Sequence, residues 1–198
     1  MIKIKKAPET MTSKQRLLHS FAYEKTDRVP IDYLANRAVH RRVCQALGIP
    51  AGNTALLNEA LGVDFQMVSA RYNGPLLYPE IEGCQVNPEN GYYTRWVENE
   101  NGGYHDFCHF PLQAADEETI QKFPFPSPDW YDYDAAIEFA KQHKEKALYV
   151  GSAGFADIIN SIGRIMGMED TLVNLLVEDE ATLDLIDRKC EMELGILE

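Results

Sequence analysis

The stretch 62-GVDFQMVSARYNGP-75 decides the fold of this chain. Apolar and small residues run from Val63 to Ala70, and the run ends in Arg71 before the turn-forming residues 72–75. A short, nearly continuous apolar run that is bounded by turn signals is typical of a strand buried on both faces, as in a parallel sheet. We therefore predict a buried strand with a cation at its carboxyl end.

Helical and strand-like segments alternate on both sides of this strand. The sequence predicts strands at 27–35 and 147–154, and helices at 12–24, 36–48, 54–62, 132–144 and 155–166, with two more helices before the end. Strands separated by helices indicate parallel βαβ units. Residues 76–113 interrupt this order with two turn signals that flank a strand-like segment, which predicts a small β-hairpin insertion.

A closed (β/α)₈ barrel needs about 250 residues, and this chain has 198. The alternation therefore predicts either a small open α/β domain or the N-terminal half of a TIM barrel, and we favour the partial barrel. Residues 1–10 are expected to be a flexible tail, and residues 11–198 a single domain.

Composition and charge exclude several classes of protein. The chain is 45% apolar and 25% charged, as in ordinary soluble domains, and its net charge of −12 argues against a nucleic-acid partner. No apolar run approaches the roughly 18 residues of a membrane span, so no membrane association is expected. The lysine-containing start lacks the apolar stretch of a secretory signal, so a cytoplasmic location is expected. Seven of the nine arginines lie in residues 1–110, which is compatible with a small anionic ligand.

The cysteines give no sign of a disulfide framework or a metal site. Cys44, Cys84, Cys108 and Cys190 are scattered, and we expect them to be reduced thiols. The segment 105-HDFCH-109 contains metal-binding residue types, but no second ligand pair follows it. Its histidines and cysteine are interpreted as packing residues, and no metal site is predicted in this chain.

Four segments resemble the uroporphyrinogen decarboxylase superfamily, most closely its divergent bacterial branch related to corrinoid-dependent methyltransferases. They are 11-MTSKQRLLHSFAYEKTDRVPIDY-33, 56-LLNEALGVDFQMVSARYNGP-75, 123-FPFPSPDWYDYDAAIEFAKQ-142 and 149-YVGSAGFADIINSIGRIMGMEDTLVNLL-176. The resemblance implies a TIM barrel with an N-terminal helical extension. It also implies that this chain supplies the first half of a longer protein and is inactive alone.

The resemblance also bears on the reaction. The superfamily contains the tetrapyrrole decarboxylase and methyltransferases that move a methyl group between a corrinoid and an acceptor. The decarboxylase has an essential aspartate where this chain has Arg71, and a guanidinium cannot accept hydrogen bonds from pyrrole N–H groups. The decarboxylase also has a tyrosine after a strand end that corresponds to Gly151–Gly154 in this chain, which lacks it. Both departures favour methyl transfer on a small carboxylated or methylated substrate.

The resemblance implies a set of site residues as well. The decarboxylase binds propionates through arginines after its first strand, and Arg37 carries over from that motif. Arg37 and Arg71 would grip a carboxylate bidentately, with Asn36 and Tyr72 as further substrate-binding residues and Asp32 as the catalytic candidate. The alternative for Arg37 is that it begins a helix and pairs with a surface acid. Separately from the resemblance, Asp64 is interpreted as a structural acceptor at the start of its strand.

The cofactors implied by the resemblance lie outside this chain. In the methyltransferases, zinc is held by a His-x-Cys pair and a later cysteine in the second half of the fold. No cofactor is therefore expected in this chain, whereas the full-length parent would use zinc and a corrinoid protein as its partner.

Two other interpretations stay open. One is tetrapyrrole decarboxylation, a lyase reaction of porphyrin biosynthesis, with Asp32 replacing the lost acid. The other is a non-catalytic binding or assembly fragment. A half-barrel exposes apolar strand edges and helix faces, so it would self-associate or pair with a complementary C-terminal half.

Overall fold

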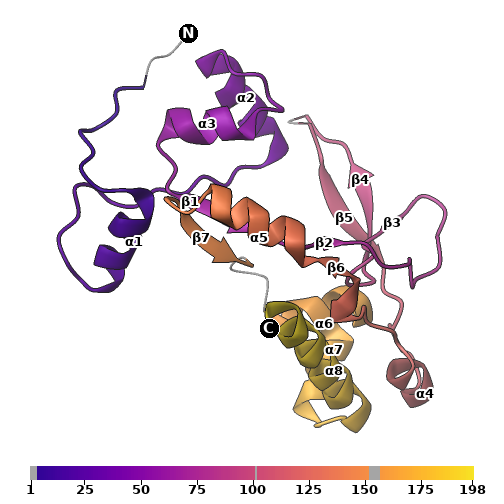
Figure 1. The fold of residues 1–198 in the computed structure, drawn as a ribbon. Helices are drawn as coiled ribbons and strands as arrows, with labels where there is room; N and C mark the ends of the chain where they lie inside the picture. The colour runs from indigo at the N-terminus through magenta and orange to yellow at the C-terminus, as the bar shows by residue number, and fades with distance from the viewer. Residues whose placement is uncertain (1–3, 101, 152–156) are drawn as a thin grey trace. The chain divides into compact units, whose positions relative to one another are not determined.

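The computed structural model describes residues 4–100, 102–151 and 157–198 (Figure 1). These residues form a mixed α/β structure with small sheets, and they form no closed barrel. The helices are α1 (Ser13–Phe21), α2 (Arg37–Leu47), α3 (Thr54–Leu61), α4 (Glu117–Gln121), α5 (Tyr133–Gln142), α6 (Ile158–Met166), α7 (Met168–Leu176) and α8 (Glu180–Leu197), with a 3₁₀ turn, η1 (Pro128–Trp130). The strands are β1 (Phe65–Val68), β2 (Arg71–Tyr72), β3 (Gln85–Val86), β4 (Tyr93–Val97), β5 (Tyr104–His109), β6 (Tyr131–Asp132) and β7 (Ala147–Val150).

The chain divides into two compact units, which are described separately. Unit 1 consists of Met1–Ser69 and Asp134–Val150, and unit 2 consists of Ala70–Tyr133 and Gly151–Glu198. The prediction of one domain over residues 11–198 stays a prediction. None of the described helices is long and apolar enough to cross a lipid bilayer.

The helices of unit 1 begin and end at the residues that the sequence favours. Thr12 and Gln15 form a capping box at the start of α1, as their spacing predicts. The Asn36 side chain accepts a hydrogen bond at the start of α2, and Gly48 ends that helix in the left-handed conformation. Gly62 ends α3 in the same way, directly before the apolar run. The predicted helices of this unit are therefore confirmed.

The sheet of unit 1 is a parallel pair, β1 and β7, which Figure 1 shows side by side. The Asp64 amide, directly before β1, donates to the Ile31 carbonyl at 2.8 Å, and the Asp64 carbonyl accepts from the Ala147 amide at 3.0 Å. The backbone of Asp64 therefore joins the segment that contains Ile31 to the start of β7. The parallel relation expected between the apolar run and the strand near residue 147 is confirmed.

Two strand predictions need correction. Residues 27–35 form no strand, because Pro30 has no amide proton and Ile31 makes one backbone bond to Asp64 instead of a ladder. The apolar run is also shorter as a strand than predicted. It ends at Val68, and Arg71 belongs to a separate strand, β2, that pairs antiparallel with β6 in unit 2. Arg71 is therefore not the last residue of this strand. The prediction of burial on both faces is also wrong, since no residue of β1 is fully buried and Met67 is 46% exposed.

The hairpin insertion predicted for residues 76–113 is present in unit 2. Strands β3, β4 and β5 form an antiparallel sheet in that order. Gly91 has a φ of 69° in the turn before β4, a conformation that favours glycine. The expectation of four reduced cysteines is wrong for two of them, since Cys84 and Cys108 form a disulfide and Cys44 and Cys190 are free.

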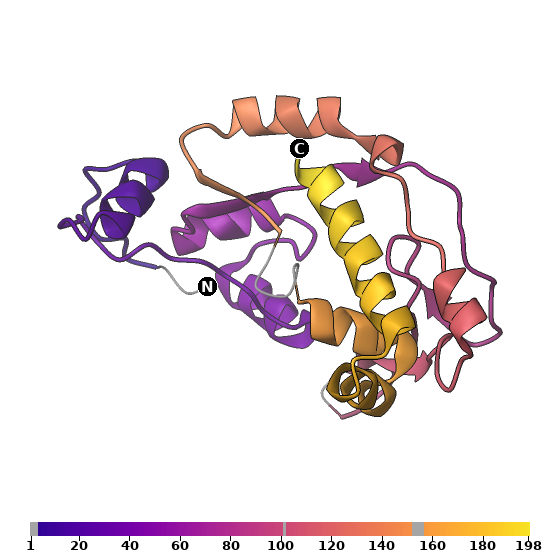
Figure 2. The same ribbon diagram turned by 90° about the horizontal axis from the view of Figure 1, so that it is seen from below.

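The core of unit 2 joins the hairpin sheet to helices far away in the sequence. Its buried members are Tyr78, Tyr93, Leu112, Ile120, Phe123, Ile162, Ile165, Met166, Ala181 and Leu185. Helix α8 packs against α6 and α7, and Figures 1 and 2 both show the three helices together. The Arg188 guanidinium on α8 also donates hydrogen bonds to the carbonyls of Ile120 and Phe123 at 3.0 and 2.8 Å, and so binds the end of α4.

Candidate functional site

Three of the predicted site residues lie in unit 1, on the segment that leads into α2. Asp32 is exposed, and its Oδ1 accepts a hydrogen bond from the Tyr33 amide at 2.8 Å. Asn36 Oδ1 accepts from the Val39 amide at 2.9 Å, so its carbonyl oxygen is engaged as the helix cap. The second carboxylate oxygen of Asp32 and the amide nitrogen of Asn36 are the groups of these residues with which a ligand could bond.

Arg37 is the first residue of α2 and is exposed. A cation is unfavourable at the N-terminus of a helix, because the backbone dipole places partial positive charge there. The alternative was that Arg37 pairs with a surface acid, and the described residues give it no such salt bridge. Ligand binding by Arg37 therefore stays a prediction.

Arg71 and Tyr72 lie in unit 2, on β2. Arg71 is exposed and is the cross-strand neighbour of Asp132 on β6. The Tyr72 hydroxyl donates to the Pro75 carbonyl at 2.7 Å, and its ring lies 5.3 Å from that of Tyr131. Burial, with a smaller contribution from Glu89, raises the pKa of Tyr72. Tyr72 therefore fixes the turn after β2, and its oxygen can still accept a hydrogen bond from a ligand.

The predicted clamp has members in both units. Arg37 belongs to unit 1 and Arg71 to unit 2, so their joint grip on one carboxylate stays a prediction. Of the stretch Gly151–Gly154, which the resemblance sets against the decarboxylase motif, Gly151 is described, and the other residues lie outside the described residues.

A buried ionic cluster in unit 1 is a charged feature that the sequence-based prediction of site residues missed. Arg16 is 1% exposed, and Asp64 is fully buried. Asp64 Oδ1 accepts from Arg16 Nη1 at 2.5 Å and from Arg28 Nη2 at 3.0 Å. Its Oδ2 accepts from Arg28 Nη1 at 2.5 Å and from the Ile31 amide at 2.8 Å.

Asp27 completes this cluster on the other side of Arg16. Its Oδ1 accepts from Arg16 Nε at 2.7 Å, and its Oδ2 accepts from the backbone amides of Thr10 and Met11. The Arg16 side-chain hydrogen bond is the main reason that the pKa of Asp27 lies well below its usual range. For Asp64, burial alone would raise the pKa, but hydrogen bonds from Arg28 and the Ile31 amide help to lower it overall.

The chemistry of the cluster is structural. Every carboxylate oxygen of Asp27 and Asp64 already accepts at least two hydrogen bonds. The two acids therefore stay ionised and have little capacity left for a substrate or a proton. The interpretation of Asp64 as a structural acceptor is confirmed. The arginine excess in the first part of the sequence, read as compatible with an anionic ligand, is explained in part by Arg16 and Arg28.

Unit 2 contains a second buried cation. Lys189 on α8 is 2% exposed, and its Nζ lies 2.9 Å from Asn90 Oδ1 and 2.7 Å from Glu193 Oε1. The same nitrogen lies 5.8 Å from the centre of the Phe125 ring. These contacts satisfy the charge, so Lys189 holds the turn before β4 against α8. No periodicity in the sequence distinguishes it from a surface lysine.

The segment His105–His109 is part of the packing of the hairpin sheet, as predicted. His105 lies against Trp96 and His109 against Tyr93, each with ring centres 5.1 Å apart, and Cys108 is in the disulfide. Within residues 4–100, 102–151 and 157–198, no group of three or more His, Cys, Asp and Glu side chains is arranged to hold a metal ion. The described residues therefore do not fit the zinc ion of the methyltransferases.

Comparison with known proteins finds no match: no family model, no curated protein and no solved structure is similar to this chain. The resemblance to the uroporphyrinogen decarboxylase superfamily rests on the four quoted segments and stays a prediction.

Proposed function

We propose that the chain forms the N-terminal part of a TIM barrel of the uroporphyrinogen decarboxylase superfamily. The supporting observation is the position of Asp64, whose peptide groups bond to Ile31 on one side and to Ala147 on the other. The segment at Ile31, β1 and β7 therefore lie next to one another in chain order, as the first three positions of a barrel would, although only β1 and β7 form strands. The ionic cluster supports the same proposal, because Arg16 attaches the helical extension α1 to the start of β1.

The proposed activity of the whole protein is methyl transfer linked to a corrinoid protein. Arg71 favours it over decarboxylation, because the resemblance sets this residue against the decarboxylase's aspartate and a guanidinium has no acceptor for pyrrole N–H groups. In this proposal Arg71 and Arg37 orient an anionic group of the substrate, and Asn36, Tyr72 and Asp32 add hydrogen bonds. Zinc and the corrinoid partner would be bound by residues outside those described.

The first test is to read the gene past the codon for Glu198 and to express the complete reading frame. The product is then incubated with methylcobalamin and a thiol, with and without zinc, and loss of the methylcobalamin absorption is followed. The proposal expects zinc-dependent demethylation that falls at least about tenfold in Arg71→Ala, as for loss of a charged hydrogen bond. Arg95→Ala, an arginine of β4, is the matched control and should retain the activity. A frame without a later His-x-Cys pair and cysteine would refute the methyltransferase proposal.

The lyase alternative is tested on the same product. Uroporphyrinogen is added under reducing conditions, and decarboxylated porphyrins are separated after oxidation. If decarboxylated porphyrins form, and no longer form in Asp32→Asn, decarboxylation becomes the proposed activity in place of methyl transfer. Asp32 has one carboxylate oxygen engaged by the Tyr33 amide, so its other oxygen is the one this alternative requires.

An assembly role is favoured by one observation in unit 2. The helix α7 and the residue after it expose Leu172, Leu176 and Val177 by 52%, 83% and 66% of their surfaces. An apolar stripe of this kind is unusual on a monomer and fits pairing with a complementary C-terminal half or with a second copy. Sedimentation of the chain alone should show concentration-dependent association, reduced in Leu172→Glu/Leu176→Glu. A single monomeric species over a wide concentration range would remove this support.

A further inference from the structure

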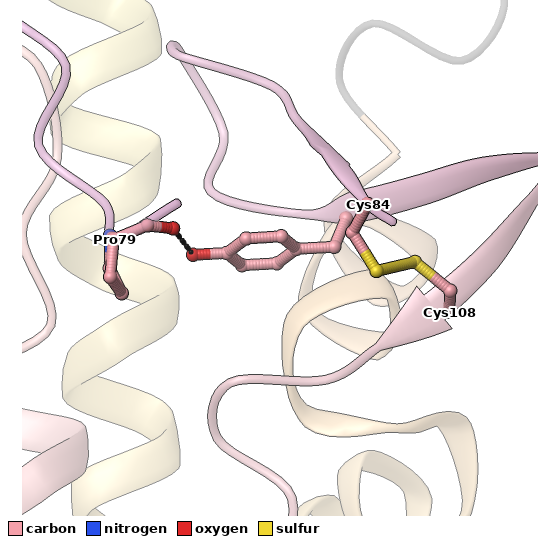
Figure 3. Close-up of a disulfide and its surroundings, with 4 residues drawn as sticks. Pro79, Cys84 and Cys108 are labelled. Carbon is pink, nitrogen blue, oxygen red and sulfur yellow. Dashed lines mark hydrogen bonds between the residues drawn. A yellow bond between two sulfur atoms is a disulfide. The ribbon is translucent and has the colours of Figure 1, made fainter. Parts of the chain in front are cut away.

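The disulfide of unit 2 links the two outer strands of the hairpin sheet. Cys84 directly precedes β3, Cys108 lies within β5, and β4 runs between these strands. Figure 3 shows the sulfur atoms of Cys84 and Cys108 joined, and the Tyr93 hydroxyl of β4 donates to the Pro79 carbonyl at 2.7 Å. The cross-link therefore spans the middle strand and does not simply close a turn.

A β-bulge places Cys108 where this cross-link needs it. Tyr93 pairs with His109 and Thr94 pairs with Phe107, so Cys108 is the additional residue on β5 with no partner on β4. A bulge leaves its extra residue outside the ladder and redirects the side chain. With Cys84 beyond the other edge of β4, the Cα atoms are 6.8 Å apart, which is within the reach of a disulfide.

Strand β3 has a short hydrogen-bonded ladder, although Val86 and the preceding Ile81 and Cys84 also pack against the core of unit 2. It consists of two residues, Gln85 and Val86, paired with Thr94 and Tyr93. The preceding residues 73–84 contain no helix or strand. This segment also lines an open hollow of about 790 Å³, whose wall includes Leu76, Glu80, Ile81, Cys84 and Val86. The disulfide is thus a covalent attachment for a two-residue strand that forms part of the wall of this hollow.

The two free cysteines are in different surroundings. Cys44 is 1% exposed, and its sulfur lies 3.5 Å from His40 Nε2 within α2. Burial, together with Glu193 and Asp187, raises the pKa of the Cys190 thiol, which lowers its thiolate fraction and its reactivity. Neither has a described disulfide partner. Both serve as internal references for the chemistry of Cys84 and Cys108.

We propose that Cys84 and Cys108 are a reversible redox pair that attaches β3 to β5 when oxidised and releases it when reduced. A two-residue ladder can open locally, and this opening exposes the disulfide to exchange with small-molecule thiols. In the oxidation, the two thiols lose two protons and two electrons and form one S–S bond. The electrons reduce a small-molecule disulfide, such as oxidised glutathione, to two thiols. This proposal does not depend on the proposed barrel or on its activity.

The test uses the unmodified chain. It is equilibrated with oxidised glutathione or with excess dithiothreitol under native conditions, unfolded, alkylated and weighed. Two alkyl groups, on Cys44 and Cys190, are expected after oxidation, and four after reduction. Reoxidation should restore two. Four groups after oxidation, or two after reduction, would overturn the proposal.

Hydrogen exchange on the same samples tests the structural consequence. Reduction should speed amide exchange at Gln85 and Val86 by about tenfold or more, whereas Trp96 and Val97 in the β4–β5 pair should change less than about twofold. Equal acceleration throughout the sheet, or no acceleration at β3, would contradict a local release of this strand.

Serine variants assign the effect to the two cysteines. Cys84→Ser and Cys108→Ser should each show the fast exchange of β3 even after treatment with oxidised glutathione. Cys190→Ser is the matched control and should keep the redox response of the unmodified chain. If a serine variant does not fold, the reduced unmodified chain gives the same comparison without any substitution, so the result remains decisive.

Discussion

Arg16 and Asp64 form a fully buried ion pair, Nη1 to Oδ1 at 2.5 Å, between the helix α1 and the residue that precedes β1. They are 48 positions apart in the sequence. Two buried charges are expensive to remove from water, and they are tolerated at this position because Asp27 and Arg28 complete the hydrogen bonding around them. The pair therefore specifies where the N-terminal helix attaches.

Replacing Arg16 by methionine should destabilise unit 1 by about 3–5 kcal/mol, because it leaves buried carboxylates without their main cation. Both tryptophans, Trp96 and Trp130, belong to unit 2, so their fluorescence does not report on this unit. Hydrogen exchange of peptides from α1 and β1 in increasing urea is the suitable measurement. Arg41→Met, at an exposed position of α2, should change the stability by less than about 0.5 kcal/mol.

Acid should weaken unit 1. The pKa values of Asp27 and Asp64 are both lowered in the folded chain, so the unfolded chain binds protons more readily than the folded one. Their contribution is therefore complete above the ordinary carboxyl pKa, near pH 4, and is lost progressively as the pH falls from there towards their lower folded pKa values. Exchange of α1 and β1 peptides between pH 7 and pH 3 should show this loss.

A variant and a salt titration check the origin of that pH dependence. Asp64→Asn should be less stable at pH 7 and should lose less stability on acidification than the unmodified chain. Because the charges are buried, added salt should alter the pH dependence only slightly. A strong salt effect, or an unchanged slope in Asp64→Asn, would assign the acid sensitivity to surface groups instead.

Substitution of two glycines with similar φ values should distinguish the cost of backbone strain from the cost of side-chain crowding. Gly91 and Gly83 have φ values of 69° and 76°. A Cβ at Gly91 would lie 2.6 Å from the ring of Tyr78 and 2.7 Å from that of Phe123, whereas one at Gly83 would meet nothing within 4 Å. Gly83→Ala should therefore cost about 1 kcal/mol through backbone strain alone, and Gly91→Ala about 3 kcal/mol because overpacking is added. Urea titrations followed by tryptophan fluorescence measure both, and equal costs would refute the crowding argument.

The attachment of α4 to α8 should depend on Arg188. Arg188→Met removes the donors to the Ile120 and Phe123 carbonyls, at a cost of about 2 kcal/mol. The same fluorescence titration applies, since this helix lies in unit 2. Lys122→Met is the control, because its pair with Glu118 is exposed and should contribute less than about 0.5 kcal/mol. A similar loss of unfolding free energy in the two variants would show that the hydrogen bonds from the Arg188 guanidinium to these carbonyls do not contribute to stability.

The sequence predicted the elements that local chemistry determines. The capping box of Thr12 and Gln15, the glycines after α2 and α3, and the hairpin between residues 76 and 113 all follow from rules that span a few residues. The parallel pairing of β1 with β7 was also predictable, because consecutive strands of one sheet that are separated by helices are usually parallel.

The features that sequence reasoning missed depend on contacts across long separations. The interpretation of Arg71 as a strand end failed because the break after Val68 and the pairing of β2 with β6 are set by residues about 60 positions away. The roles of Arg16 and Lys189 were missed for the same reason, since a buried cation looks like a surface one until its acid is located. The cysteines were predicted to be reduced because they are scattered in the sequence and no secretory signal precedes them. The bulge at Cys108, which brings its Cα within 6.8 Å of that of Cys84, cannot be read from the sequence.

The grip of Arg188 on α4 has a consequence for synthesis of the chain. A five-residue helix is too short to persist by itself in water, and the arginine that binds its last carbonyls follows Phe123 by 65 positions. A ribosome therefore releases residues 117–123 well before their anchor exists. During that interval the apolar side chains of Ile120 and Phe123 are exposed and accessible to chaperones. These residues can pack only after α8 has been synthesised as far as Arg188.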